Sequence, residues 1–175
     1  METAIISIIC IVLILVGGMT MAQGFLSSVD TTTLGMETVV ERDEGIMRTN
    51  LATISASYLP SNILEVVLQN NGQTKLSDFA KWDVIVQYYD SGSAYYVTWL
   101  PYTENATPGD NQWRKEGIYL DAQNLTAEVF EPGILNPGEE MIIEAKVNPT
   151  VGTGTTNLVV TSTPSGIPAS ISFTN

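Results

Sequence analysis

The sequence predicts an α+β protein, in which a long N-terminal α-helix, apolar at first and then amphipathic, precedes an all-β sandwich head. Two observations carry this prediction. Residues 3–29 contain no charged side chain, and apolar residues continue beyond them at helical spacing. After Pro60 the apolar residues alternate with polar ones, as they do in half-buried strands. The predicted boundaries are 1–58 for the helix and 59–175 for the head.

The first part of the predicted helix is apolar on almost every side. From Ala4 to Leu26 the surface suits either lipid or a bundle of other apolar helices. A charge-free helix of this length can cross a hydrocarbon core about 30 Å thick, and it exceeds the apolar part of a secretory signal, about 7–15 residues. Neither Lys nor Arg precedes it in the sequence. Because the run is long enough and uncharged, it is expected to insert into a membrane.

The helix is expected to continue beyond this apolar part. Apolar residues recur at steps of three, four or seven, at Met36, Val40, Met47, Leu51, Ile54 and Tyr58. The polar residues between them are Glu37, Glu41, Glu44 and Arg48. This pattern is typical of an amphipathic helix. Since no proline occurs before Pro60, a single helix of about 85 Å is predicted, ending near residue 58.

The head reads as a series of short strands separated by turns rich in Gly, Pro and Asn. The strand candidates are 63–69, 82–89, 93–100, 125–130, 139–148, 155–162 and 169–173. About seven strands in about 115 residues predict a two-sheet sandwich with immunoglobulin-like topology. In 139–148, for example, Met141, Ile143 and Ala145 form one apolar face, as expected for a sheet with one wet side.

Composition excludes several classes of function. The formal charge is −12, from 19 acidic and 7 basic residues, so a nucleic-acid partner is not expected. Histidine is absent and the single cysteine, Cys10, lies in the apolar run, which removes the usual metal ligands and the commonest general base. The scattered acids, Asp90, Glu104, Asp110 and Asp121, form no known calcium motif. We expect neither an enzyme nor a cofactor or metal site.

Aromatic residues are frequent in the head, at Trp82, Tyr88, Tyr89, Tyr95, Tyr96, Trp99 and Trp113. Most are expected in the core or in cross-strand pairs. Because neighbours on a strand point to opposite faces, one tyrosine of each pair, 88/89 and 95/96, should point outward. Such outward rings could anchor neighbouring subunits.

The architecture resembles the archaellins and, more widely, the type IV pilin superfamily. The matching features are the apolar run Ala4–Val16, the long helix and the all-β head. The segment from Leu64 to Gly72, which ends in Asn-Asn-Gly, and the following segment from Phe79 to Val84 also look like the first strands of archaellin and archaellar stator heads.

This resemblance implies a structural subunit of an extracellular archaellum or type IV pilus-like helical filament, used for motility or adhesion. The N-terminal helices of many copies would pack as the filament core, and the β heads would form the sheath. A prepilin-type peptidase and the filament assembly machinery would be partners, and a leader would be cut just before Met1. The chain would sit in the cytoplasmic membrane before assembly and on the cell surface afterwards.

Specific residues follow from this interpretation. Core helix packing is expected at Ile5, Ile9, Val12, Leu13, Val16, Gly17, Gly18 and Ala22. Small residues are where helices approach most closely. Asn105-Ala-Thr and Asn124-Leu-Thr match the N-glycosylation pattern in an exported head, so Asn105 and Asn124 are candidate glycan sites.

A second interpretation uses the same elements differently. The chain would be a membrane-anchored protein like the archaellar stator components, whose β head binds the cell envelope. The two interpretations differ in whether the apolar helix leaves the lipid. An exported enzyme tethered to the membrane would need a nucleophile and a base, and the sequence offers no such pair.

Overall fold

The computed structural model describes residues 2–175, except for the side chains of residues 2–4, 31, 34, 35, 37, 38 and 41. The predicted roles of Ala4, Glu37 and Glu41 in the helix surface therefore lie outside the described side chains. The chain divides into two compact units, residues 1–44 and 45–175. The first is helical. The second is a β-sandwich, called the head below.

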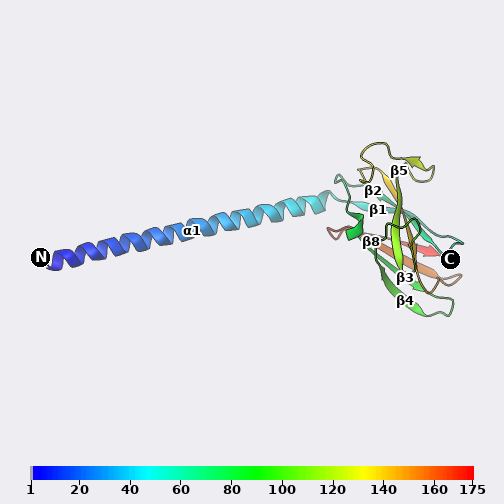
Figure 1. Cartoon of the computed structure of the whole chain (residues 1–175), viewed down its shortest axis with the longest axis horizontal. Helices are drawn as coiled ribbons and strands as arrows, with labels where there is room; N and C mark the ends of the chain where they lie inside the picture. The colour runs from blue at the N-terminus through cyan, green and yellow to red at the C-terminus, as the bar shows by residue number, and fades with distance from the viewer. Residues whose placement is uncertain (1) are drawn as a thin grey trace. The chain divides into compact units, whose positions relative to one another are not determined.

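A single helix, α1 (Glu2–Arg48), forms the N-terminal part of the chain (Figure 1). Within it, Ile5–Asp30 is long and apolar enough to cross a membrane, with a mean hydropathy of 2.7. Its 26 residues would extend about 39 Å as a helix, more than the roughly 30 Å of a hydrocarbon core. The predicted apolar helix is thus present.

The helix ends at Arg48, and the prediction of a helix to residue 58 is wrong. The Arg48 carbonyl accepts a 2.7 Å hydrogen bond from the Gln73 backbone N–H, and the Thr49 hydroxyl donates to the Gly45 carbonyl at 2.7 Å. Two carbonyls of the last turn, which would otherwise lack partners, are satisfied in this way. The turn after the second strand therefore holds the end of the helix.

Residues after the helix form a strand, β1 (Leu51–Tyr58), which the sequence prediction assigned to the helix. Leu51, Ile54 and Tyr58 recur at helical spacing, but the strand has a register shift between Thr53 and Ser55, which resets its alternation. Pairing with the next strand, and the stacking of Tyr58 on Phe173 at 6.3 Å, override the helical spacing. The head therefore begins before residue 59.

Eight further strands and one short 3-10 helix complete the head (Figure 1). They are β2 (Leu64–Asn70), η1 (Phe79–Lys81), β3 (Asp83–Tyr89), β4 (Tyr95–Leu100), β5 (Gln112–Asp121), β6 (Thr126–Ala127), β7 (Glu140–Lys146), β8 (Thr156–Ser162) and β9 (Pro168–Thr174). A five-stranded sheet has the order β1-β2-β7-β5-β6, and a four-stranded sheet has the order β4-β3-β8-β9. Neighbouring strands are antiparallel.

The core lies between the two sheets and contains the inward residues of each strand. Trp82, Trp113 and Tyr88 are its largest fully buried side chains. Trp82 also donates from Nε1 to the Ser77 carbonyl at 2.9 Å, so its polar atom stays satisfied. Apolar side chains from β2, β3 and β7 fill the space between them. The predicted α+β architecture with an all-β sandwich is confirmed.

Two strands besides β1 differ from the sequence prediction. β5 was not predicted, because Arg114, Lys115 and Glu116 are consecutive charged residues and a register shift between Lys115 and Gly117 breaks the alternation. The predicted strand 125–130 is reduced to β6, because Leu125 has φ 51° and begins outside the extended region. In both places a local irregularity of the backbone interrupts the alternation of apolar and polar residues by which a strand is predicted.

Candidate functional site

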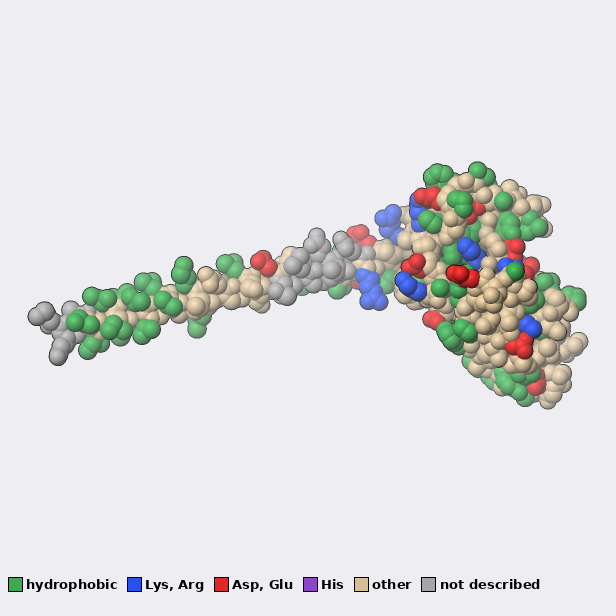
Figure 2. Space-filling view, in the orientation of Figure 1, with side chains coloured by type: hydrophobic (Ala, Val, Ile, Leu, Met, Phe, Trp, Pro, Cys, Tyr) green, Lys and Arg blue, Asp and Glu red, His purple; other side chains and the backbone are tan. Residues whose placement is uncertain are grey.

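The apolar surface of α1 is the first functional feature. The side chains of Ile5, Ile9, Val12, Leu13 and Val16 are 51% to 65% exposed in the single chain. Figure 2 shows hydrophobic side chains on the visible face and along both edges of this part of the helix. Removing each such side chain from water is worth about 1.5–3 kcal/mol. This surface therefore requires lipid or other helices around it.

The eight residues predicted to pack in a filament core lie on more than one side of the helix. At about 100° per residue, Ile5, Ile9, Val12, Leu13 and Val16 share one face. Gly18 and Ala22, four residues apart, lie on another face, and Gly17 lies between the two. No described atom outside the helix backbone lies within 4 Å of a Cβ built on Gly17 or Gly18. Close approach of another helix is thus sterically open there, and the packing role stays a prediction.

The head carries a second exposed apolar surface, on the outer side of β3 and β4. It consists of Ile85, Tyr89, Tyr95, Val97 and Trp99 and is called the aromatic face. The last four are 42% to 61% exposed. Cross-strand pairing joins Tyr89 to Tyr95 and Ile85 to Trp99, and the Tyr89 and Tyr95 rings lie 5.1 Å apart. These residues form one continuous patch.

The tyrosines on the inner side of β3 and β4 confirm the prediction that one tyrosine of each adjacent pair points outward. Tyr88 is fully buried and stacks on half-buried Tyr96 at 5.4 Å, while Tyr89 and Tyr95 face solvent. The alternation of the pleat produces this division. The sequence predicted that each pair would split, but the core contacts decide which member is buried.

Hydrogen bonds hold the aromatic face in a defined arrangement. Trp99 Nε1 donates to Asp83 Oδ1 at 2.8 Å, and the Tyr95 hydroxyl donates to Gln87 Oε1 at 2.9 Å. β3 and β4 carry a single charged residue, Asp83, and it is engaged by Trp99. The patch is therefore rigid, apolar and almost free of charge, which is typical of the centre of a protein interface.

β4 lies at the open edge of its sheet. Among the strands that the structure describes, it pairs with β3 alone. At the other end of the sheet, β9 lies against β1, and Thr53 donates from its hydroxyl to the Ser170 carbonyl at 3.0 Å. The β9 edge of this sheet is thus covered by β1, and the β4 edge remains available for pairing with another strand.

Both candidate glycan sites lie on the surface of the head. Asn105 is exposed in the loop between β4 and β5, and Asn124 is exposed in the turn after β5. Asn124 Nδ2, the atom that would carry a glycan, donates to Asp121 Oδ2 at 2.7 Å. Modification of Asn124 would replace one of the two hydrogens on this Nδ2, and glycosylation of either residue stays a prediction.

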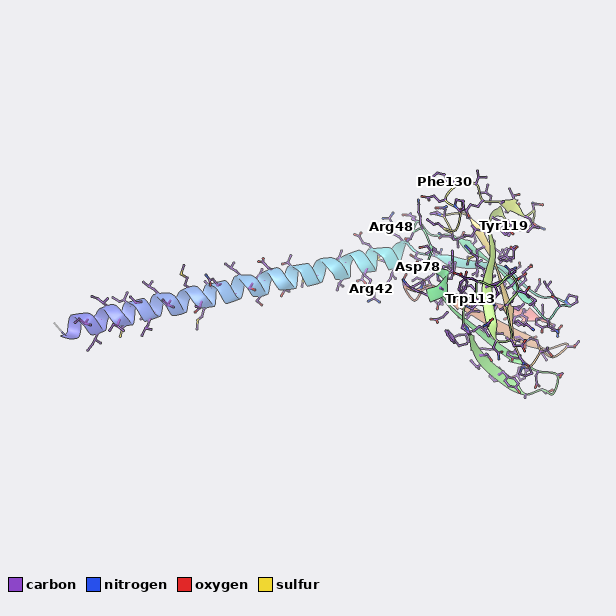
Figure 3. All side chains as sticks on the ribbon, viewed as in Figure 1. Arg42, Arg48, Asp78, Trp113, Tyr119 and Phe130 are labelled. Atoms are coloured by element: carbon purple, nitrogen blue, oxygen red, sulfur yellow. The ribbon has the colours of Figure 1, made fainter. Side chains whose placement is uncertain are left out.

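The acidic side chains of the head are the remaining candidates for metal ligands. No group of three or more His, Cys, Asp or Glu among the described residues is placed to hold a metal ion. Asp110 instead pairs with Lys146 at 2.6 Å, and this ammonium lowers the pKa of the Asp110 carboxyl. Trp113, labelled in Figure 3, is fully buried in the core of the head, and its indole ring is neither a metal ligand nor titratable.

Known proteins share this fold. No curated protein matches the chain by sequence. The archaellum periplasmic stator protein FlaG from Sulfolobus acidocaldarius is 19% identical, with a TM-score of 0.51 over 71% of this chain and 99% of that chain. The periplasmic stator complex of FlaF and FlaG from the same organism gives 19% identity and a TM-score of 0.50, over 70% of this chain and 87% of that chain.

A filament structure is similar over a longer stretch. The archaeal flagellum of Methanospirillum hungatei strain JF1 is 14% identical, with a TM-score of 0.53 over 99% of this chain and 91% of that chain. At such identities these likenesses show the fold. The predicted kinship with archaellum proteins is confirmed by a family match over residues 48–169, described as conserved flagellar protein F, immunoglobulin-like domain. The match spans well over half of the sequence, so this archaellum-related chain belongs to the family of the conserved flagellar protein F, immunoglobulin-like domain.

Proposed function

We propose that this protein is a membrane-anchored, stator-like component of the archaellum, whose head binds a second protein of the cell envelope through the aromatic face. The observation that carries the proposal is the family match over the head, joined to an apolar stretch of α1, Ile5–Asp30, that is long enough to cross a membrane. The sequence alone favours the filament subunit over the anchored protein, whereas the family match supports the anchored protein.

The anchor would be Ile5–Asp30, which is long enough to cross a bilayer with its ends near the headgroups. Beyond it, residues 31–48 continue the same helix for about 27 Å. This segment carries the first basic residues of the chain, Arg42 and Arg48 (Figure 3). A charged continuation of this kind suits water or headgroups rather than hydrocarbon.

The aromatic face would supply the binding energy of the head. Tyrosine and tryptophan dominate the energetics of protein interfaces, and these rings are already fixed by Asp83 and Gln87. Little side-chain entropy would be lost on binding. The similar FlaF and FlaG proteins form a periplasmic stator complex. We infer a partner of the same kind, a second β-sandwich subunit, for this face.

A second candidate function is a subunit of the archaellum filament. The similarity to the archaeal flagellum covers 99% of this chain, helix included. In that case many copies would assemble, and the apolar side chains of α1 would leave the lipid and pack against each other. The peptidase and assembly machinery expected from the sequence would then be partners.

Fractionation of the source cells separates the two functions. Filaments are sheared off and collected, membranes are pelleted, and peptides of this chain are quantified by mass spectrometry in both fractions. The anchored protein should be recovered in the membrane fraction, should need detergent for extraction and should be a trace component of filaments. If this chain instead dominates thin filaments seen by electron microscopy, the filament function replaces the stator-like one.

A further inference from the structure

A groove of about 720 Å³ lies on the outer surface of the five-stranded sheet, away from the aromatic face. Its floor consists of Val67, Ala122 and Ile142, a small apolar cluster separate from the main core. Ile54 and Leu125 stand at its sides. The volume lies within the range of about 300–1,000 Å³ that is usual for ligand pockets.

Two irregular strands shape this groove. The register shift in β1 lies at Ile54, so the bulge leaves this side chain without a pairing partner and 47% exposed. A second shift occurs in the β5–β6 pairing between Tyr119 and Asp121. After it, the Ala122 N–H donates to Glu140 Oε2 at 2.7 Å, and Leu125 adopts φ 51° with its side chain 62% exposed. Bulges at two strands thus leave apolar side chains exposed beside the groove.

The groove is acidic. Glu65, Asp121 and Glu140 line it, and the described residues that line it include neither Lys nor Arg. The Asp121 carboxylate accepts hydrogen bonds from Asn124, and the Glu140 carboxylate accepts one from the Ala122 N–H. None of these three carboxylates forms an ion pair with a described cation. Glu65 differs from the other two because its carboxylate has no hydrogen bond in the described part of the chain, so both of its oxygens are available to an incoming cation.

Glu65 also has like-charged neighbours. It is paired directly across the β2–β7 ladder with Glu144, and like charges in this position are destabilising. Arg114, the nearest cation along the ladder, is bound to Glu144 at 2.7 Å. Partial burial, followed by the charges of Glu144 and Glu116, raises the pKa of Glu65. A cation brought from outside would relieve this repulsion.

We propose that this groove binds an extended segment of a partner protein in which a Lys or Arg is next to a large apolar side chain. The apolar side chain would cover Val67, Ala122 and Ile142, and the cation would pair with Glu65. Charge complementarity identifies this occupant, because an acidic side chain would meet three carboxylates and a purely polar one would leave the floor uncovered. The site goes beyond the proposed function, since it lies on the other sheet and does not depend on the aromatic face.

The probe for the test is a fluorescent octapeptide of alternating leucine and lysine, with a leucine–glutamate octapeptide as its counterpart. Binding to the detergent-solubilised full chain is measured by fluorescence polarisation. Glu65→Lys should weaken binding of the leucine–lysine peptide by about tenfold or more, because attraction becomes repulsion. Glu104→Lys is the matched control, since it changes the net charge equally at an exposed loop residue that does not line the groove.

Two more variants keep the test decisive. Glu65→Gln removes the charge with little change in shape and should weaken binding several-fold, and Ile54→Ser should weaken it by removing an apolar side. Equal losses for Glu65→Lys and Glu104→Lys would overturn the site, because binding would then reflect net charge alone. Unchanged peptide binding in both single variants, Ile54→Ser and Glu65→Gln, would overturn the site as well. None of these results depends on where the chain resides in the cell, so failure here leaves the proposed function standing.

Discussion

At the scale of single residues, Gly72 is the position on which the junction between helix and head depends. A Cβ added there would lie 2.5 Å from the Asn50 nitrogen and 2.7 Å from the Arg48 oxygen. Both are backbone atoms, so no side-chain rotation could relieve the clash. The Asn-Asn-Gly turn that the sequence marked as a simple turn is therefore also the element that contacts the end of α1.

Gly72→Ala should lower the free energy of unfolding of the head by about 2 kcal/mol or more, since the Gln73 to Arg48 hydrogen bond would be displaced. Chemical denaturation of the detergent-solubilised chain measures it. Gly45→Ala is the control, because no described atom within 4 Å would meet its Cβ, and alanine favours a helix by up to about 1 kcal/mol. Equal stability of the two variants would contradict the role given to Gly72.

Tyr119 makes the stability of the head sensitive to alkaline pH. Its hydroxyl donates to Glu116 Oε2 at 2.7 Å, and this bond, with burial, raises the pKa of Tyr119 to about 12. The folded chain thus holds the phenol proton more tightly than the unfolded chain, in which tyrosine ionises near pH 10. The contribution is intact below about pH 10 and is lost as the pH rises towards about 12.

Tyr119→Phe should therefore lose less stability than the wild-type chain between about pH 10 and 12. Urea denaturation across this range, combined with the ultraviolet absorbance of tyrosinate, tests the prediction. Glu116→Gln should lower the pKa of Tyr119 towards its ordinary value, because the carboxylate acceptor is gone. Identical alkaline losses in the wild-type chain and in Tyr119→Phe would show that other groups are responsible.

At the scale of elements, the sequence predicted those whose pattern is regular. The uncharged run before Asp30 predicts an apolar helix from composition alone, and the second half of β7 alternates between buried and half-buried residues. The end of α1 could not be found in this way, because Leu51, Ile54 and Tyr58 fit both a helix and a bulged strand. Only pairing with β2 decides between them, and the spacing of apolar residues within β1 does not reveal that pairing.

The candidate sites, like the strands and the helix, were predictable only where they depend on a regular local pattern. The aromatic face was partly predictable, since strand alternation separates adjacent tyrosines whatever the topology. The acidic groove was not, because Glu65, Asp121 and Glu140 come together only when β2, β7 and the end of β5 share one sheet. The signal that could have marked Asp121 in the sequence was its acidity alone, which is shared by many solvated residues.

The apolar part of α1 gives a prediction at the same scale. Leu13→Arg places a charge inside the span, where insertion of a charge costs up to about 2.5–3.5 kcal/mol, so less protein should remain in the membrane. Val129→Arg is the control, because Val129 is exposed on the head, outside the span. Carbonate extraction of membranes measures both. Retention of Leu13→Arg at the wild-type level would contradict membrane anchoring by this helix.

At the scale of the whole molecule, the two units have complementary tasks. α1 offers a surface that needs lipid or other helices, and the head offers two different faces on its two sheets. The aromatic face is nearly uncharged and the groove is acidic, so they suit different partners. The proposed membrane-anchored component would use such separate contacts to bind more than one envelope protein.

Photocross-linking in the source cells from Val97, replaced by a photoreactive phenylalanine derivative, tests the central claim most directly. Val97 lies in the aromatic face, and Leu120, exposed on β5 of the other sheet, is the control position. The stator-like account predicts one discrete product with a second envelope protein from position 97 and none of that product from position 120. A ladder of cross-linked multiples of this chain would contradict it and would identify a filament subunit.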